Sequence, residues 1–176
     1  MKATLLVLGL WLAGGILTLA LAAETTSANR FDSTIQSKVA QLTTKKEFRK
    51  VQASIEDGIV TLTGNVDLYQ QKLDATKKVR KIAKVQGVRN LIAVNGNVSD
   101  TQLTIALDRK LYYDRLAQDN VFNYVTASAE NGVVTLSGET RNEFDRDSAL
   151  SLVNNTTGVK DVIDNIKVAP VSIFDD

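Results

Sequence analysis

The sequence predicts an α+β protein made of two tandem αββαβ modules, each a small mixed three-stranded sheet with two helices. The main evidence is an internal repeat. The block Asp57–Gly64 returns later in the chain as Asn131–Gly138, with only mild chemical changes. A second pair of similar blocks, Gly87–Ile92 and Gly158–Ile163, follows in the same order but with a slightly shorter offset. The difference between the two offsets predicts a three-residue insertion in the first copy, near Asp67–Tyr69.

A β-hairpin is predicted at the centre of each copy. Apolar and polar residues alternate along Val51–Glu56 and again along Val125–Glu130, as in strands that bury one face. Asp-Gly or Asn-Gly follows directly, with Gly58 and Gly132 as the glycines. These dipeptides strongly favour a type I′ turn, because both central residues of that turn need a positive φ. The outgoing strands and the glycines expected to end them are Ile59–Thr63 with Gly64, and Val133–Ser137 with Gly138.

An amphipathic helix and a last strand are predicted after each hairpin. The apolar positions that mark the helices are Leu73, Thr76, Val79, Ile82 and Ala83 in the first copy, and Phe144, Leu150 and Val153 in the second. Gly87 and Gly158 are expected to close these helices in a left-handed conformation, with the following valine packing on the last turn. The last strands are expected at Leu91–Val94 and Val162–Val168. Because strand, helix and strand form a crossover, each last strand should pair in parallel.

A further helix is predicted before each hairpin. Ser33 and Ser99 each stand three residues before a glutamine, which is capping-box spacing, and Val98 and Leu103 fit a hydrophobic staple. The apolar positions are Ile35, Val39 and Leu42 in the first copy, and Leu103, Leu107 and Leu111 in the second. Only residues 95–97 separate the copies, and units of about 70 residues are marginally stable alone. We therefore expect the copies to pack on each other.

The N-terminus carries the pattern of a secretory signal. Lys2 precedes an uncharged stretch, residues 3–23, and Ala20 and Ala22 fit a signal-peptidase site. The sequence predicts a signal peptide over residues 1–22. An uncleaved membrane anchor stays open, because the apolar stretch approaches the ~20 residues that a spanning helix needs. Residues 170–176 are expected to form a C-terminal tail, with proline closing the last strand.

Composition removes most catalytic and metal sites. The chain has no cysteine and no histidine. It therefore has no disulfide, no thiolate nucleophile and no Cys/His zinc site, and it lacks the usual general base near neutral pH. No phosphate loop, nucleophile elbow or calcium loop is present. We expect a protein that is not an enzyme, with no cofactor and no metal.

The ordered motif Asp/Asn-Gly-x-Val-Thr-Leu-x-Gly, an amphipathic helix and Gly-Val resembles the BON domain family. The match covers both copies, with the domains expected at residues 31–98 and 99–169. With the signal, the chain resembles the osmotically inducible periplasmic proteins of that family. The resemblance implies an αββαβ fold, a periplasmic location and binding to phospholipid or envelope surfaces, and it carries no catalytic residues over. Two departures are the insertion in the first copy and Thr140, which stands where the first copy has Val66.

Charge divides the two copies. Residues 23–98 hold 13 basic and 7 acidic side chains, a net charge of +6, whereas residues 99–176 hold 7 basic and 13 acidic, a net charge of −6. The cations that cluster on the second predicted helix of the first copy are Lys72, Lys77, Lys78, Arg80, Lys81 and Lys84. They fit a site for anionic lipid headgroups, a solvated helix face, or a surface that docks on the acidic copy. Nucleic acid is disfavoured, because no aromatic residue accompanies these cations.

The predicted function is therefore that of an exported periplasmic protein that binds anionic phospholipid or envelope surfaces, in envelope maintenance or osmotic stress. The alternative is a protein-interaction or scaffold module of the cell envelope, without lipid binding and with self-association. The six repeated glycines, at positions 58, 64, 87, 132, 138 and 158, are assigned to turns and caps rather than to function.

Overall fold

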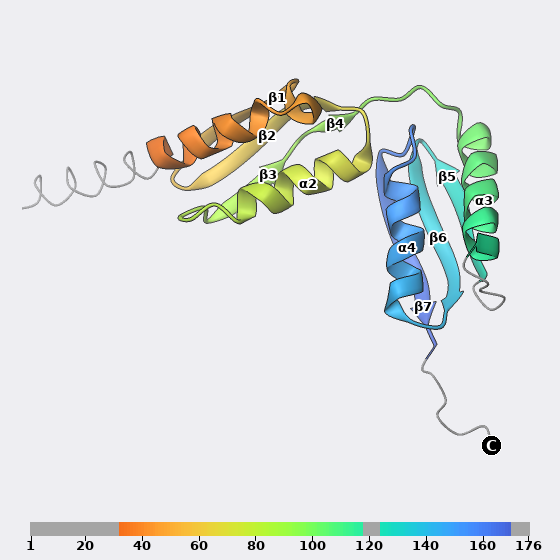
Figure 1. Ribbon diagram of the computed structural model, residues 1–176. Helices are drawn as coiled ribbons and strands as arrows, with labels where there is room; N and C mark the ends of the chain where they lie inside the picture. The colour runs from red at the N-terminus through yellow and green to blue at the C-terminus, as the bar shows by residue number, and fades with distance from the viewer. Residues whose placement is uncertain (1–31, 118–123, 170–176) are drawn as a thin grey trace, which may run out of the picture.

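The computed structural model describes residues 32–117 and 124–169, which form two α+β modules joined by a short linker (Figure 1). The first module consists of a helix over residues 32–43, η1 (Lys46–Phe48), β1 (Val51–Glu56), β2 (Ile59–Val66), α2 (Tyr69–Arg80), β3 (Gly87–Asn90) and β4 (Ala93–Val94). The second consists of α3 (Asp100–Ala117), β5 (Tyr124–Glu130), β6 (Val133–Thr140), α4 (Glu143–Asn154) and β7 (Asp161–Val168). Both follow the predicted αββαβ order.

Each module has one mixed sheet with a hairpin and a parallel crossover. β1 pairs antiparallel with β2, and β3 and β4 pair parallel with β2 on its other side. In the second module β5 pairs antiparallel with β6, and β7 pairs parallel with β6 over its whole length. The type I′ signal is confirmed at both turns, because Asp57, Gly58, Asn131 and Gly132 all have a positive φ.

Each module has its own hydrophobic core between the sheet and its helices. The buried residues of the first core include Ile35, Val39, Phe48, Val60, Leu62, Val79 and Ile92. Those of the second include Leu103, Leu107, Val134, Leu136, Val153, Val159 and Ile166. Thr140 is 2% exposed, like its counterpart Val66, and its hydroxyl donates to the carbonyl of Asn142. The buried hydroxyl therefore keeps a partner.

The structure corrects the predicted alignment of the copies. β3 begins at Gly87 opposite Ile59, and β7 begins at Asp161 opposite Val133. Gly87 therefore corresponds to Asp161, at the same offset that relates the two hairpins. The Gly-Val echo between Gly87 and Gly158 is not a structural equivalence, and no insertion lies near residues 67–69. Gly158 has the left-handed conformation expected of it, but its counterpart with positive φ is Lys84. Gly87 instead lies in a strand, where its pairing with β2 fixes it.

Strand ends also differ from the prediction. Gly64 and Gly138 lie inside β2 and β6, which continue for two more residues. Each has a positive φ, and a Cβ would collide with the carbonyl oxygen of Lys50 or Tyr124 in the neighbouring segment. These glycines therefore permit close backbone approach rather than ending a strand.

The last strand of the first module starts earlier than predicted and is broken in two. The predicted strand Leu91–Val94 corresponds to the gap after β3 together with β4. At the break, the side chain of Asn90 accepts from the backbone N–H of Ile92 at 3.0 Å. Asp164 accepts from Ile166 in the same way at 3.0 Å, although β7 stays continuous there.

The helices differ in detail from their predicted faces. α2 ends at Arg80, so the predicted positions Ile82 and Ala83 lie beyond it, and its buried residues are Ala75 and Val79. Phe144, predicted to face the core, is 73% exposed. Ser99 caps α3 by accepting from the N–H of Gln102 at 3.4 Å, whereas Ser33 lies within a helix that already includes residue 32.

The real length difference lies between each first helix and its hairpin. The N–H of Gly58 donates to Asp32, 26 residues before it, at 3.0 Å. The N–H of Gly132 donates to Asp100, 32 residues before it, at 2.9 Å. The same contact therefore aligns Asp32 with Asp100 in the first helices and Gly58 with Gly132 in the hairpins. Between these two points the second module carries six extra residues.

The modules meet where α2 begins. Tyr69 packs against the second core, and its hydroxyl donates to Asp161 at 2.6 Å. Burial, together with the hydrogen bond and negative charge of Asp161, raises the pKa of Tyr69 to about 12. In the linker, Asn95 donates to Asp67 at 3.0 Å, while Val98 packs on the second core beside Gly158. The copies therefore pack on each other.

Candidate functional site: the basic face of the first module

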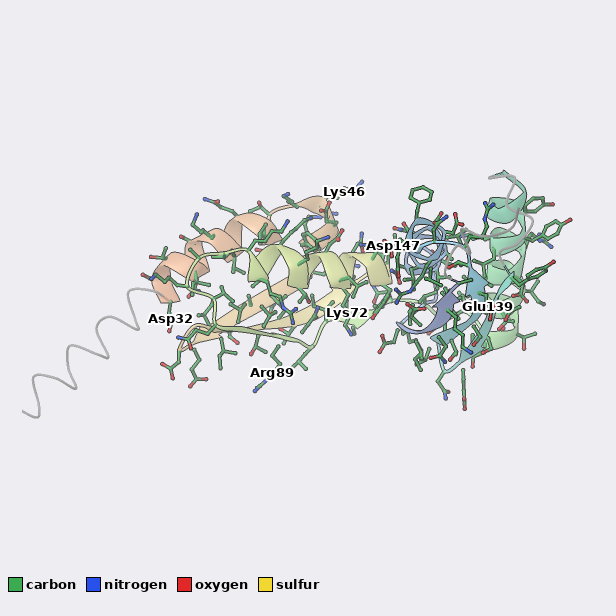
Figure 2. All side chains as sticks on the ribbon, turned by 90° about the horizontal axis from the view of Figure 1, so that it is seen from below. Asp32, Lys46, Lys72, Arg89, Glu139 and Asp147 are labelled. Carbon is green, nitrogen blue, oxygen red and sulfur yellow. The ribbon has the colours of Figure 1, made fainter. Side chains whose placement is uncertain are left out.

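The predicted cations gather on the C-terminal half of α2 and on the turn that follows it. Lys77 and Arg80 are exposed on the helix, and Lys81 is its exposed C-cap. Lys84 lies beyond the helix with a φ of 74°. Lys72 is half-buried in the first turn, at the end of α2 nearest the second module (Figure 2). We use the term basic face for these five residues together with Lys78. Positive charges near the C-terminus of a helix are also stabilised by the helix dipole.

Lys78 is tied down within its own module. Its Nζ lies 3.2 Å from Oε1 of Glu47 and 4.6 Å from the centre of the Phe48 ring. It therefore fixes η1 against α2 and is a weaker candidate for an external ligand. By contrast, no carboxylate of the described residues lies within 4.0 Å of the ammonium of Lys77 or Lys81 or the guanidinium of Arg80. These three cations face solvent.

Four further cations, which the sequence prediction missed, lie around η1. They are Lys45, Lys46, Arg49 and Lys50, and all four are exposed. Glu47, the acid among them, is already paired with Lys78. Because the Lys78 contacts bring η1 beside α2, these cations lie near the basic face and extend the positive surface around it. The sequence does show four cations close together between the first helix and β1. A search for charged residues along one face of a helix does not find them, because they lie outside the long helices.

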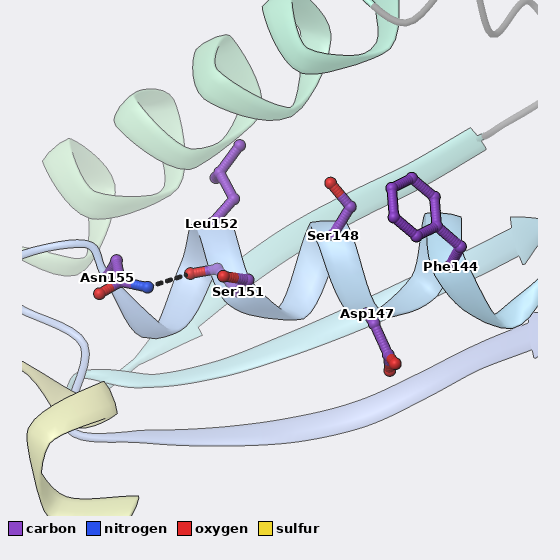
Figure 3. Close-up of a pocket in the computed structure, with 6 residues that line it drawn as sticks. All are labelled: Phe144, Asp147, Ser148, Ser151, Leu152 and Asn155. Carbon is purple, nitrogen blue, oxygen red and sulfur yellow. Dashed lines mark hydrogen bonds between the residues drawn. The ribbon is translucent and has the colours of Figure 1, made fainter. Parts of the chain in front are cut away.

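The same helix face is different in the second module. The counterparts of Lys77, Lys78 and Lys81 are Ser151, Leu152 and Asn155, which line a shallow groove of about 490 Å³ on α4 (Figure 3). Exposed Phe144 stands at one end of this groove. Arg146, the counterpart of Lys72, is held by Asp164 at 2.6 Å and Glu143 at 2.9 Å. Its hydrogen bond to Asp164, with that to Glu143, raises the pKa of Arg146.

The described residues contain no group of three or more acidic side chains that would hold a metal ion. Within the same residues, no helix combines the length and apolar character needed to cross a membrane. The predicted signal peptide and C-terminal tail lie outside the described residues.

Comparison with known proteins identifies the class. Two stretches, residues 31–96 and 99–170, match the BON domain. Together they cover most of the chain, which therefore belongs to the BON domain family and contains two tandem BON domains. The chain is also 28% identical over 147 residues to the osmotically-inducible protein Y of Escherichia coli strain K12, covering 77% of this chain and 72% of that protein. It is a distant relative of that protein.

Two solved structures also align with the chain. Both are of CdsD, a structural protein of the type III secretion system of Chlamydia trachomatis, and one is its C-terminal domain. The first is 18% identical with a TM-score of 0.35, covering 80% of this chain and 64% of that chain. The second is 18% identical with a TM-score of 0.31, covering 79% and 67%. At these TM-scores the likeness carries no conclusion about this chain.

Proposed function

We propose that this protein is an exported, periplasmic binding module that contacts anionic phospholipid surfaces through the basic face of its first BON domain, without catalysing a reaction. The observation that carries the proposal is the group of exposed cations Lys77, Arg80 and Lys81, which have no acidic partner among the described residues. The apolar segment before residue 23 and the distant relation to an osmotically-inducible protein support export and a role in envelope stress.

The energetics fit a reversible, peripheral contact. Each cation near an anionic surface contributes on the order of 1 kcal/mol, so the three exposed cations supply a weak but usable attraction. Screening shortens this attraction to about 8 Å at physiological ionic strength. Binding should therefore rise with the anionic lipid content of the membrane and fall with added salt.

Vesicle flotation with a matched pair of charge reversals tests the proposal. Lys77→Glu/Lys81→Glu removes two exposed cations of the basic face, and Arg109→Glu/Lys167→Glu makes the same change in net charge on exposed residues of the second module. We expect anionic vesicles to bind wild type and the second variant, and to lose the first. Equal loss in both variants would show that only net charge matters, and no binding by wild type would refute the lipid function.

A scaffold function is the second candidate, and exposed apolar residues favour it. Leu91 and Ile59 in the first module are 59% and 43% exposed, and Ile163 in the second is 48% exposed. Together with the opposite charges of the modules, these surfaces fit binding to another envelope protein. Light scattering across a salt series tests this candidate, which predicts complexes that dissociate as salt screens the charges.

A further inference from the structure

A groove on the first module lies between its first helix and the edge strand β1, on the opposite side of β2 from β3. Its volume is about 280 Å³. The residues that line it include Gln36, Ala40 and Thr43 on the helix and Val51, Ala53 and Ile55 on the strand. The lining therefore combines apolar side chains from the strand with polar ones from the helix.

The groove exposes unpaired backbone groups of the edge strand. The two-residue turn pairs Glu56 with Ile59, so alternate β1 residues bond to β2 while Ala53 and Ile55 direct their N–H groups outward. No acceptor among the described residues receives either N–H. An edge strand with free backbone donors is a template for another strand.

In the second module, side chains of α3 cover the corresponding edge strand, β5. There the N–H of Ala127 donates to Asp108 at 3.4 Å and the N–H of Ala129 donates to Thr104 at 3.2 Å. Both acceptors lie on α3, so the helix caps the edge of β5. In the alignment that places Asp32 on Asp100, their counterparts are Ala40, which has no acceptor side chain, and Gln36, which makes no such bond. The open edge is therefore particular to the first module.

Charge indicates what the groove binds. Exposed cations, among them Arg49 and Lys50, directly precede β1 at one end of the groove, whereas Glu56 and Asp57 lie at the other. A segment with alternating apolar residues followed by acidic ones would fit if it ran antiparallel to β1. The chain itself carries a similar segment, because Val171 and Ile173 stand two positions apart, Phe174 is a third apolar residue, and Asp175 and Asp176 follow.

We infer that the groove of the first module binds residues 171–176 of a second copy of this chain, added antiparallel to β1 as an extra strand. A second copy is required because Asp161, at the start of β7, bonds Tyr69 beside the first module. β7 then runs eight residues away from that contact, about 23 Å at a strand rise of 3.3 Å. This contact uses a different surface from the basic face and stands independently of the proposed lipid binding.

Two double variants, each with a matched companion variant, test the groove and its occupant separately. Gln36→Thr/Ala40→Asp installs the capping residues of the second module, and Gln41→Asp places an acid on the exposed side of the same helix as the control. Asp175→Lys/Asp176→Lys leaves the groove intact and reverses the charge of its occupant. Arg49→Glu/Lys50→Glu supplies the compensating change.

The experiment titrates a fluorescein-labelled peptide of residues 169–176 with the protein and follows anisotropy, together with amide NMR. We expect saturable binding, with shifts at the Ala53 and Ile55 amides and none at Ala127 and Ala129. Capping the groove, or reversing the peptide's two acids, should weaken binding about ten-fold or more. The control Gln41→Asp should not change it, and Arg49→Glu/Lys50→Glu should restore the charge-reversed peptide.

Three outcomes would overturn the inference. The first is no binding of the peptide, and the second is equal binding by the capped variant with its remaining amide spectrum native. The third is self-association of the full chain that persists unchanged in Asp175→Lys/Asp176→Lys, which would assign the edge to direct β1–β1 pairing.

Discussion

The helices α2 and α4 occupy the same place in the two modules but present different surfaces. α2 ends in Lys77, Lys78 and Arg80, whereas the last turn of α4 has no basic residue. Their buried positions remain equivalent, with Ala75 and Val79 in α2 matching Ala149 and Val153 in α4. The repeat therefore preserved the side of the helix that faces the sheet while the outer side diverged. This is expected if the shared fold constrains packing and each module has its own partner.

Replacing the two glycines inside strands β2 and β6 tests how far the modules depend on each other. In Gly64→Ala and Gly138→Ala the new Cβ meets a carbonyl oxygen of the adjacent segment, at a φ that L-residues avoid. We expect each change to lower the free energy of unfolding by about 2–4 kcal/mol. Urea unfolding followed by NMR reads each module separately. If Gly64→Ala destabilises both modules equally, the junction couples them into one folding unit; if only the first melts early, they fold independently.

Transferring cations between the helices tests whether the basic face alone distinguishes the modules. Ser151→Lys/Asn155→Lys gives α4 the counterparts of Lys77 and Lys81 at exposed positions. At about 1 kcal/mol per cation, reduced by screening, we expect vesicle binding to strengthen about ten-fold at low salt. Flotation over a salt series measures this gain, with Ser151→Gln/Asn155→Gln as the uncharged control. An unchanged affinity would mean that the rest of the α2 surface is also needed.

The two aspartates that hold the hairpin turns, Asp100 and Asp32, should contribute differently to the free energy of unfolding. Asp100 accepts from Asn131 at 2.7 Å and from Gly132 at 2.9 Å, whereas Asp32 accepts from Gly58 at 3.0 Å. Because hydrogen bonds to a charged group are the stronger ones, we expect Asp100→Ala to cost about 2 kcal/mol and Asp32→Ala about 1 kcal/mol. Thermal unfolding checks the order. Equal costs would indicate that only the glycine N–H bond contributes.

Much of the fold was predictable because local signals fix it. Asp57-Gly58 and Asn131-Gly132 specify the turn by themselves, and the crossover rule then gives the parallel strand. The Gly-Val echo misled the alignment because Gly87 and Gly158 share a sequence context but not a conformation. The sequence wrongly predicts a strand end at Gly64, because the close approach of Gly64 to Lys50 depends on a neighbouring segment that sequence spacing does not reveal.

The sequence predicts which cations form the candidate site, but not which of them are engaged by other residues of the same module. The cations of α2 are evident from the sequence, but the engagement of Lys78 by Glu47 and Phe48 depends on how η1 packs. Asp100 stands at the start of a helix, where an acidic side chain is common because the helix dipole stabilises it. Its position in the sequence therefore does not indicate that it also bonds to the hairpin turn. The open edge of β1 became visible only when the side chains that cap β5 were compared with their counterparts.

The smallest predicted effect concerns the junction. Tyr69→Phe removes the hydroxyl that donates to Asp161 at 2.6 Å and should cost about 1 kcal/mol at pH 7. The folded pKa of Tyr69, raised by burial and Asp161 to about 12, lies above the ordinary value of 10.0. The folded state therefore holds the proton more tightly, and this contribution is complete below pH 10 and lost as the pH rises through 12. Urea unfolding of wild type and Tyr69→Phe at pH 7 and pH 11.5 should show a stability difference that shrinks at the higher pH. A difference that stays constant would assign the effect of the substitution to packing against the second core rather than to the bond with Asp161.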